Sequence, residues 1–130
     1  MMFNKKKRWH CLPGQPLTEL DKKVMYWESK GKEVPTRQLI KTPEQIEGIR
    51  RSGVVNTGCL DEVARQIHVG MNTQEIDDIC MQYCKEHHAI PACLNYEGYP
   101  KSVCTSINEV VCHGIPKKED VLQEGDIVNV

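Results

Sequence analysis

His113 is the side chain of this sequence best placed to carry chemistry. It follows a run rich in β-branched residues and precedes the turn Gly114-Ile115-Pro116, where a strand delivers its last side chain to a rim. A histidine at neutral pH can donate a hydrogen bond or move a proton. The bland alternative is a packed or solvated histidine at a turn, and placement alone leaves both interpretations open.

Two tyrosines and two cysteines precede His113 in the chain, and they supply aromatic rings and thiols. They are Cys93, Tyr96, Tyr99 and Cys104. Such a wall is soft and polarisable, which suits a thioether side chain such as that of methionine. Core packing is the alternative for cysteines and tyrosines in strands. Gly98 and the step Tyr99-Pro100 indicate a bent, partly exposed segment, and this favours a cleft.

A zinc site is a second possibility. Cys80 and Cys84 lie one helical turn apart, and His87 and His88 follow. Structural zinc sites usually show paired CxxC or CxxC…HxxxH spacing, and the sequence has neither. These positions also coincide with an apolar helical stripe, so packing is the stronger interpretation. His10-Cys11 is weaker still, because no second pair accompanies it.

Nucleophilic catalysis by Cys104 or Cys112 is a third possibility, since His113 is adjacent to Cys112 in the sequence. Neighbouring residues of a strand point to opposite faces, so Cys112 and His113 would not meet easily. The sequence holds no Gly-rich phosphate loop and no HExxH motif.

Two amphipathic helices precede these residues. Thr42-Pro43-Glu44-Gln45 offers an N-cap, a proline suited to the first helical position and a capping-box glutamine, and it predicts a helix to about His68, stopped by Gly70. Its apolar stripe is expected at Ile46, Ile49, Gly53, Thr57, Leu60, Ala64 and Ile67. Asn72-Thr73 begins a second helix, whose apolar face is expected at Ile76, Ile79, Cys80, Tyr83, Cys84 and His87.

After Pro91 the apolar period changes to two. Val103, Thr105 and Ile107 alternate with smaller residues and predict a strand, and Asn108-Glu109 offers a turn into a further strand at 110–112. Gly125 precedes one more strand, 126–130.

Residues 1–40 read as a basic extension. They hold nine Lys or Arg and four Asp or Glu, a net charge of +5, whereas residues 41–130 carry −6. Thr18 is predicted to cap a short helix that presents Leu20, Val24 and Trp27. The charge has two interpretations: a solvated tail, or contact of residues 1–12 with a polyanion, meaning RNA if the protein works near ribosomes.

Composition narrows the class of protein further. With 130 residues, 39% hydrophobic and 27% charged, the chain can form one modest domain with a real core. No run approaches the roughly 20 apolar residues that span a bilayer, and the basic cluster at residues 5–8 is not followed by the apolar stretch of a secretory signal. Seven cysteines, an odd number, indicate a reducing cytoplasm rather than a disulfide scaffold.

The motifs YEGYPKSVCTSINEVVCHGIP and EGDIVNV, with KTPEQIEGIRRSG before them, resemble type I methionine aminopeptidases from about Lys41 to the last residue. The resemblance implies the pita-bread α+β fold and removal of initiator methionine from nascent proteins. Residues 41–130 would form the N-terminal half of that domain, with two helices packed on an incomplete antiparallel sheet. Residues 1–40 would be an extension that the resemblance does not cover.

The resemblance also implies roles for individual residues. His113 would contact the substrate and help to stabilise the tetrahedral intermediate, and the four aromatic and sulfur residues would form the methionine pocket. The backbone carbonyls of Asn108 and Val110 would bind a structural monovalent cation. Two divalent ions, Co, Mn, Fe or Zn, would serve the complete enzyme, which would be a cytoplasmic monomer without membrane association.

Two departures from the family pattern matter. Glu97 stands where many relatives carry His near the pocket rim. The family's metal ligands are two Asp, one His and two Glu, the first of which would follow at position 131. We therefore expect a truncated chain that holds no metal and is inactive alone. The rival interpretation is a non-catalytic half-fold that binds the ribosome or another partner.

Overall fold

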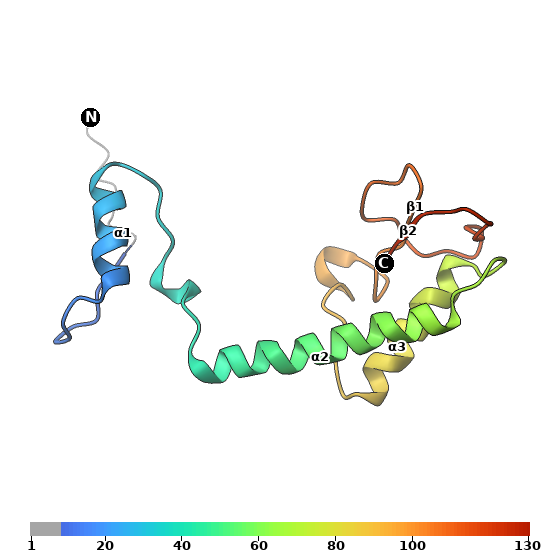
Figure 1. Ribbon diagram of the computed structural model, residues 1–130, viewed down its shortest axis with the longest axis horizontal. Helices are drawn as coiled ribbons and strands as arrows, with labels where there is room; N and C mark the ends of the chain where they lie inside the picture. Colours follow the sequence, from blue (N-terminus) through green and yellow to red (C-terminus); the bar gives the residue numbers. More distant parts are fainter. Residues whose placement is uncertain (1–8) are drawn as a thin grey trace. The chain divides into compact units, whose positions relative to one another are not determined.

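The structure, a computed structural model, describes residues 9–130 (Figure 1). The chain divides into two compact units, Met1–Ile46 and Glu47–Val130, which are described here one at a time. Helices dominate, and two short antiparallel strands complete the second unit. This composition confirms the predicted α+β class.

The first unit is organised around Trp9. Its ring packs with Val24 and Val34 in a small apolar cluster, and its Nε1–H donates to the Asp21 carboxylate at 2.9 Å. Arg37, from the 3-10 turn η1 (Arg37–Leu39), pairs with the same carboxylate and lies 4.6 Å from the centre of the Trp9 ring. One aromatic residue thus gathers the apolar and the charged side chains of the unit.

Helix α1 spans Glu19–Ser29, which confirms the helix predicted behind Thr18. Thr18 and Asp21 form a reciprocal capping box. Hydrogen bonds from the hydroxyl and backbone N–H of Thr18 lower the pKa of Asp21. The hydrogen bond from Trp9 and the charge of Arg37 lower it further. The carboxylate therefore stays ionised although Asp21 is buried.

The packing face predicted for α1 is wrong at two of its three positions. Val24 is buried, but Leu20 and Trp27 are 46% and 45% exposed. The reason is that Trp9 covers the side of the helix that carries Val24 and Asp21. The Trp27 ring instead meets Tyr26 edge to face.

Helices α2 (Pro43–Gln66) and α3 (Thr73–Glu86) confirm the two predicted long helices and their starts. Thr42 and Gln45 exchange hydrogen bonds at 2.9 and 3.2 Å, and Asn72 and Glu75 do the same before α3. These reciprocal bonds satisfy backbone donors that a helix start otherwise leaves free.

The core of the second unit lies where α2, α3 and the strand segment meet. Its buried members are Cys59, Val63, Met71, Ile76, Cys80 and Leu122. Ile76 is fully enclosed, which contributes about 1.5–3 kcal/mol relative to an exposed side chain. The predicted face of α3 is confirmed at its centre, whereas His87 at its end is exposed and stacks on Tyr83.

The apolar stripe predicted for α2 is wrong. Ile49 and Leu60 are 58% and 42% exposed, while Cys59 and Val63 are the buried positions. Gly58 explains the choice, because a Cβ atom there would lie 2.1 Å from the Tyr83 hydroxyl oxygen. A larger residue at position 58 would have to displace the Tyr83 ring of α3.

The sheet is smaller than predicted. Strands β1 (Ser106–Ile107) and β2 (Val128–Asn129) pair antiparallel, with Ile107 opposite Val128. Residues 110–112 form no strand, and Val111 is 91% exposed. Asn108 causes the difference, because its φ of 50° takes the backbone out of the extended region before a hairpin can form.

Candidate functional site

Asp77 of α3 anchors the segment that carries the candidate site. Its carboxylate accepts hydrogen bonds from the backbone N–H and the hydroxyl of Ser102, at 2.7 and 2.5 Å, and all these groups are buried. Lys101 lies 3.9 Å from the other carboxylate oxygen and also donates to Gln74. A helix thus fixes the chain between Tyr99 and Cys104, two of the predicted site residues.

Tyr99 is the centre of the predicted sulfur–aromatic group. Its hydroxyl donates to the Val103 carbonyl at 3.0 Å and reaches the Gly114 carbonyl at 3.4 Å. Burial, followed by the nearby Cys104 and Cys93 thiols, raises its pKa. The phenol therefore stays protonated and donating at neutral pH, and both thiols lie close enough to affect it.

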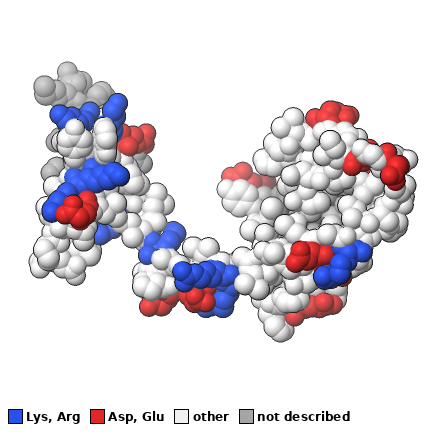
Figure 2. Space-filling view, viewed as in Figure 1, with Lys and Arg blue, Asp and Glu red and all other residues white. Residues whose placement is uncertain are grey.

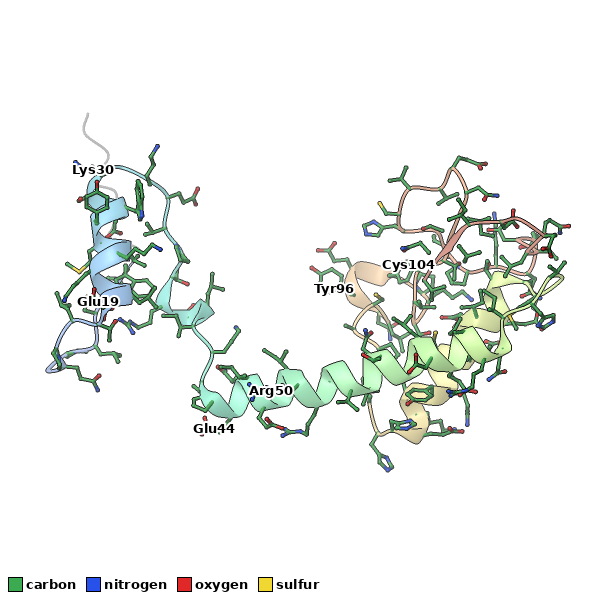
Figure 3. The ribbon with its side chains drawn as sticks, in the orientation of Figure 1. Glu19, Lys30, Glu44, Arg50, Tyr96 and Cys104 are labelled. Carbon is green, nitrogen blue, oxygen red and sulfur yellow. The ribbon has the colours of Figure 1, made fainter. Side chains whose placement is uncertain are left out.

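Tyr96, which is labelled together with Cys104 in Figure 3, lies on the 3-10 turn η2 (Tyr96–Gly98). It is 67% exposed, and within the described chain its side chain makes no hydrogen bond and no aromatic stacking contact with the other site residues. The turn is closed by hydrogen bonds from Asn95 N–H to the Tyr99 carbonyl, 2.8 Å, and from Tyr99 N–H to the Tyr96 carbonyl, 2.9 Å. Tyr96 therefore stands at the open side of the group.

Five non-glycine residues have left-handed backbone conformations, and all lie between positions 88 and 113 of the described chain. They are His88, Asn95, Glu97, Asn108 and His113. Each such residue typically costs 1–2 kcal/mol, with asparagine the best tolerated. Four of the five are residues that the sequence singles out on other grounds, namely His88, Glu97, Asn108 and His113.

His113 is exposed, with a φ of 57°, and it makes no hydrogen bond within residues 9–130. The residue after it is held tightly: Thr105 N–H donates to the Gly114 carbonyl at 2.9 Å, and Gly114 N–H donates to the Ser106 hydroxyl at 3.3 Å. The Tyr99 hydroxyl meets the same Gly114 carbonyl. The residue next to His113 therefore contacts the Tyr99 hydroxyl, while the imidazole of His113 makes no hydrogen bond within residues 9–130.

Thr105, beside Gly114, carries the one orphaned polar atom found in the described residues. It is 3% exposed, and its hydroxyl has no hydrogen-bond partner there. A buried hydroxyl without a partner costs about 1–3 kcal/mol. The described residues thus leave one buried hydroxyl of the candidate site without a hydrogen bond.

Asn108 replaces its own backbone in the strand ladder. Its N–H donates to the Ile127 carbonyl at 2.9 Å, but Ile127 N–H donates to the Asn108 side-chain Oδ1 at 3.0 Å, in the place of the main-chain oxygen. The side-chain amide also donates to Asp126 at 2.8 Å. The Asn108 carbonyl is thereby released from the ladder, as a cation ligand would need to be.

Val110, the second predicted cation ligand, follows on the same loop. Its N–H donates to the Ile107 carbonyl at 3.0 Å, and this bond folds the loop back on the end of β1. The Asn108 and Val110 carbonyls thus belong to one short turn, which the structure keeps 42% exposed at Val110.

No group of three or more His, Cys, Asp or Glu side chains converges as a metal site anywhere in residues 9–130. Cys80 is buried in the core and His87 stacks on Tyr83, so the alternative zinc site at Cys80, Cys84 and His87 does not form. Burial also raises the pKa values of Cys80 and Cys84. These thiols act as apolar packing groups rather than as thiolate ligands.

The exposed cysteines do not form a nucleophilic pair with histidine either. Cys112 and His113 are both exposed, and no hydrogen bond joins them in the described chain. All seven cysteines are free thiols.

A separate hollow of about 410 Å³ lies between α2 and α3. Its lining comprises Glu62, Gln66, Asp78, Ile79, Gln82, Tyr83 and Glu86. It contains none of the predicted site residues.

In the part of the chain that the structure covers, no helix is both long and apolar enough to span a bilayer.

Sequence reasoning missed Asp77 and Ser102, which position the site. Twenty-five residues separate them, and an acidic residue in an early turn of a helix has an ordinary explanation in the helix dipole. It also missed the side-chain pairing of Asn108. The only available signal was the Asn-Glu turn itself, which does not specify which oxygen the partner strand uses.

The α2–α3 pair packs against a small antiparallel sheet, and the candidate site residues lie on the segment between α3 and that sheet and on the loop after β1. Residues 47–130 fit the model of metallopeptidase family M24, and the chain belongs to this family. Methionine aminopeptidase of Escherichia coli strain K12 is 52% identical over 92 residues, which cover 70% of this chain and 35% of that protein.

Two solved structures are similar as well. The methionine aminopeptidase of Rickettsia prowazekii superposes with a TM-score of 0.65 at 43% identity, over 68% of this chain and 36% of that chain. That of Thermotoga maritima gives a TM-score of 0.67 at 38% identity, with the same coverage. These similarities confirm the pita-bread α+β fold class. The chain spans about a third of the length of the curated relatives that it matches.

Proposed function

We propose that this chain is the N-terminal part of an enzyme that removes the initiator methionine from nascent proteins. The observations that carry the proposal are the 52% identity over 92 residues to a protein named methionine aminopeptidase and the family match over residues 47–130, which contain the candidate site. In this proposal residues 41–130 form the N-terminal half of the catalytic domain, and residues 1–40 form an extension.

The candidate site supports a role in gripping methionine. Cys93, Tyr99 and Cys104 are neighbours, and sulfur and aromatic faces contact a thioether favourably. Tyr96 would close the open side of the pocket, and it is exposed enough to move onto a substrate. Because the Tyr99 hydroxyl is used inside the fold, only its ring is left for the substrate.

His113 is proposed as the residue that hydrogen-bonds the substrate and the tetrahedral intermediate. Its ring is exposed and unpaired in residues 9–130, while Gly114 is pinned to Thr105 at 2.9 Å. A free donor on a fixed backbone is the arrangement that stabilises developing negative charge. The left-handed backbone at position 113 is a cost that such a role would justify.

The family is one of metallopeptidases, and we propose two divalent ions, Co, Mn, Fe or Zn, in the complete enzyme, where they would activate water. The described residues of this chain do not fit such ions, because no set of donors converges. No chemical step is therefore assigned to a metal here, and we propose that the 130-residue chain is inactive alone.

We further propose a structural monovalent cation at the carbonyls of Asn108 and Val110. Support comes from the ladder, in which Ile127 N–H uses the Asn108 side chain and leaves the main-chain oxygen available. Two carbonyls from one turn would supply part of an oxygen ligand set.

The test is release of methionine from the peptide Met-Ala-Ser, measured with the protein as its gene encodes it and with residues 1–130 alone. The natural protein should release methionine only after a divalent metal is added, and His113→Ala should lower kcat by roughly 10²-fold or more. Turnover by residues 1–130 alone would contradict their proposed inactivity. Absence of turnover by the metal-loaded natural protein would remove the function itself.

A second candidate function is a non-catalytic module that binds the ribosome through residues 1–12. The observation that favours it is the net charge of +5 on residues 1–40. Residues 1–8 of this segment lie outside the described residues. Co-sedimentation with ribosomes should fall on deletion of residues 1–12 and with rising salt. Unchanged co-sedimentation would eliminate this candidate.

We also propose that the protein works in the cytoplasm, as a monomer when complete. The free state of all seven cysteines supports a reducing compartment.

A further inference from the structure

Glu97 occupies an unusual position between two tyrosines of the candidate site. It lies on η2, with φ 48° and ψ 31°, directly after Tyr96 and two residues before Tyr99. Left-handed backbone is rarely adopted by glutamate, whereas glycine accepts it freely. A strained residue that faces solvent brings no packing gain, and such strain is commonly kept for function.

The turn around Glu97 is held on both sides. Asn95 before it is also left-handed, Gly98 after it has a φ of 84°, and Tyr99 bonds back to both Asn95 and Tyr96. Tyr99 in turn is fixed through its hydroxyl to Val103 at 3.0 Å. The backbone at Glu97 is therefore held in place by Tyr99, one of the candidate site residues.

Glu97 is also electrostatically isolated. Between positions 89 and 108 the only other charged residue is Lys101, which is engaged by Asp77 and Gln74. Glu97 itself makes no ion pair or hydrogen bond through its carboxylate in the described chain. In Figure 2 acidic atoms stand apart on the surface of the second unit over η2. The edge of the candidate site thus bears one unneutralised negative charge.

The geometry points to Glu97 as a specificity-determining residue that selects peptides with a lysine or arginine shortly after the N-terminal methionine. This inference rests on the proposed function. The methionine side chain would enter between Cys93, Tyr99 and Cys104, and the following residues would leave past the exposed Tyr96 and Glu97. A cation about 4 Å from an exposed carboxylate gains enough in water for about a five-fold preference.

The test compares three peptides, Met-Ala-Lys, Met-Ala-Ser and Met-Ala-Glu, with the natural-length, metal-loaded protein. We expect kcat/KM to fall in that order, by about five-fold between the lysine and the serine peptide. The difference should lie in KM rather than in kcat. Glu97→Gln should remove the order, and Glu97→Lys should reverse it. The preference should also shrink at 1 M salt, where screening acts within about 3 Å. Glu124→Gln, at another exposed carboxylate of the same unit, is the matched control and should keep the order.

The outcomes separate this inference from the proposed function. Turnover of all three peptides with no charge preference, or with the same preference in Glu97→Gln, overturns the inference and leaves the function standing. A uniform loss for all three peptides in Glu97→Gln also overturns it, since the carboxylate would then hold the common α-ammonium group. If no peptide is hydrolysed, NMR titration with the same peptides decides, and equal affinities for the lysine and glutamate peptides overturn it.

Discussion

Thr105 and Gly114 approach each other so closely that no side chain fits between them. The Thr105 N–H donates to the Gly114 carbonyl at 2.9 Å, and a Cβ atom on Gly114 would lie 1.9 Å from the Thr105 carbonyl oxygen. The segment that carries His113 is therefore held against the segment that precedes β1 by a direct backbone contact, beside the hydrogen bonds from the Tyr99 and to the Ser106 hydroxyl groups.

Gly114→Ala should destabilise the second unit by about 1–3 kcal/mol, because backbone rather than a movable side chain must give way. Urea unfolding with unchanged m-value measures the loss. Gly53→Ala is the control, since a Cβ atom there meets nothing within 4 Å and its helical backbone favours alanine. It should stabilise by about 0.5–1 kcal/mol. Equal effects of the two changes would contradict the close contact.

Asp77→Ala should cost about 1–3 kcal/mol, because it leaves the buried N–H and hydroxyl of Ser102 without an acceptor. Hydrogen exchange of the Ser102 amide should accelerate with it. Asp78→Ala, at the adjacent exposed position, should change stability by no more than about 0.5 kcal/mol. If the Ser102 amide stays equally protected in Asp77→Ala, the anchor is not the carboxylate.

Thiol labelling should sort the cysteines by burial. Cys93 and Cys112 are exposed and should react first with iodoacetamide, while Cys59 and Cys80 are buried and should react last. The pKa of Cys80 is raised by burial, which further lowers its thiolate fraction. Mass spectrometry after short exposures gives the order directly.

A methionine peptide should then protect Cys93 and leave Cys112 unchanged. The reason is that Cys93 belongs to the proposed pocket and acts on the pKa of Tyr99, whereas Cys112 is not among the groups that shift this pKa. Equal protection of both cysteines would place the peptide elsewhere.

Acid should loosen the turn at Asn108. Backbone hydrogen bonding from Gln123 and the side chain of Asn108 lower the pKa of Asp126 below its ordinary value of 3.8. The bonds therefore stabilise the fold fully above that value, and the contribution is lost as pH falls through the lowered folded pKa. The Asn108 side-chain NMR signals should report this change below about pH 4. Asp126→Asn should make them insensitive to pH in this range.

The helices were predictable because their signals are local. Thr42 with Gln45 and Asn72 with Glu75 lie three residues apart, and the sequence shows each pair. The face by which α2 packs was not predictable, since Gly58 opens that side only in the presence of Tyr83 from another helix. The predicted face followed the larger apolar residues of α2, such as Ile49 and Leu60, and these are exposed.

The candidate site residues can be named from the sequence, but the framework that holds them cannot. The thiols of Cys93 and Cys104 lie close enough to Tyr99 to raise the pKa of its phenol, and their role as a binding site stays a prediction. Their attachment through Asp77 depends on a residue far away in sequence. The strand after Asn108 failed because alternation of apolar residues cannot reveal a left-handed φ.

The left-handed residues between 88 and 113 invert the usual ranking of amino-acid replacements. Glycine, commonly among the most harmful exchanges in ordered chain, relaxes the backbone at Asn95, Glu97 and His113, while valine or isoleucine would be the worst choice. A saturation library across this segment would therefore carry the imprint of backbone shape as well as of chemistry. Positions that accept glycine for folding yet lose selectivity or turnover would be those whose side chains touch the peptide.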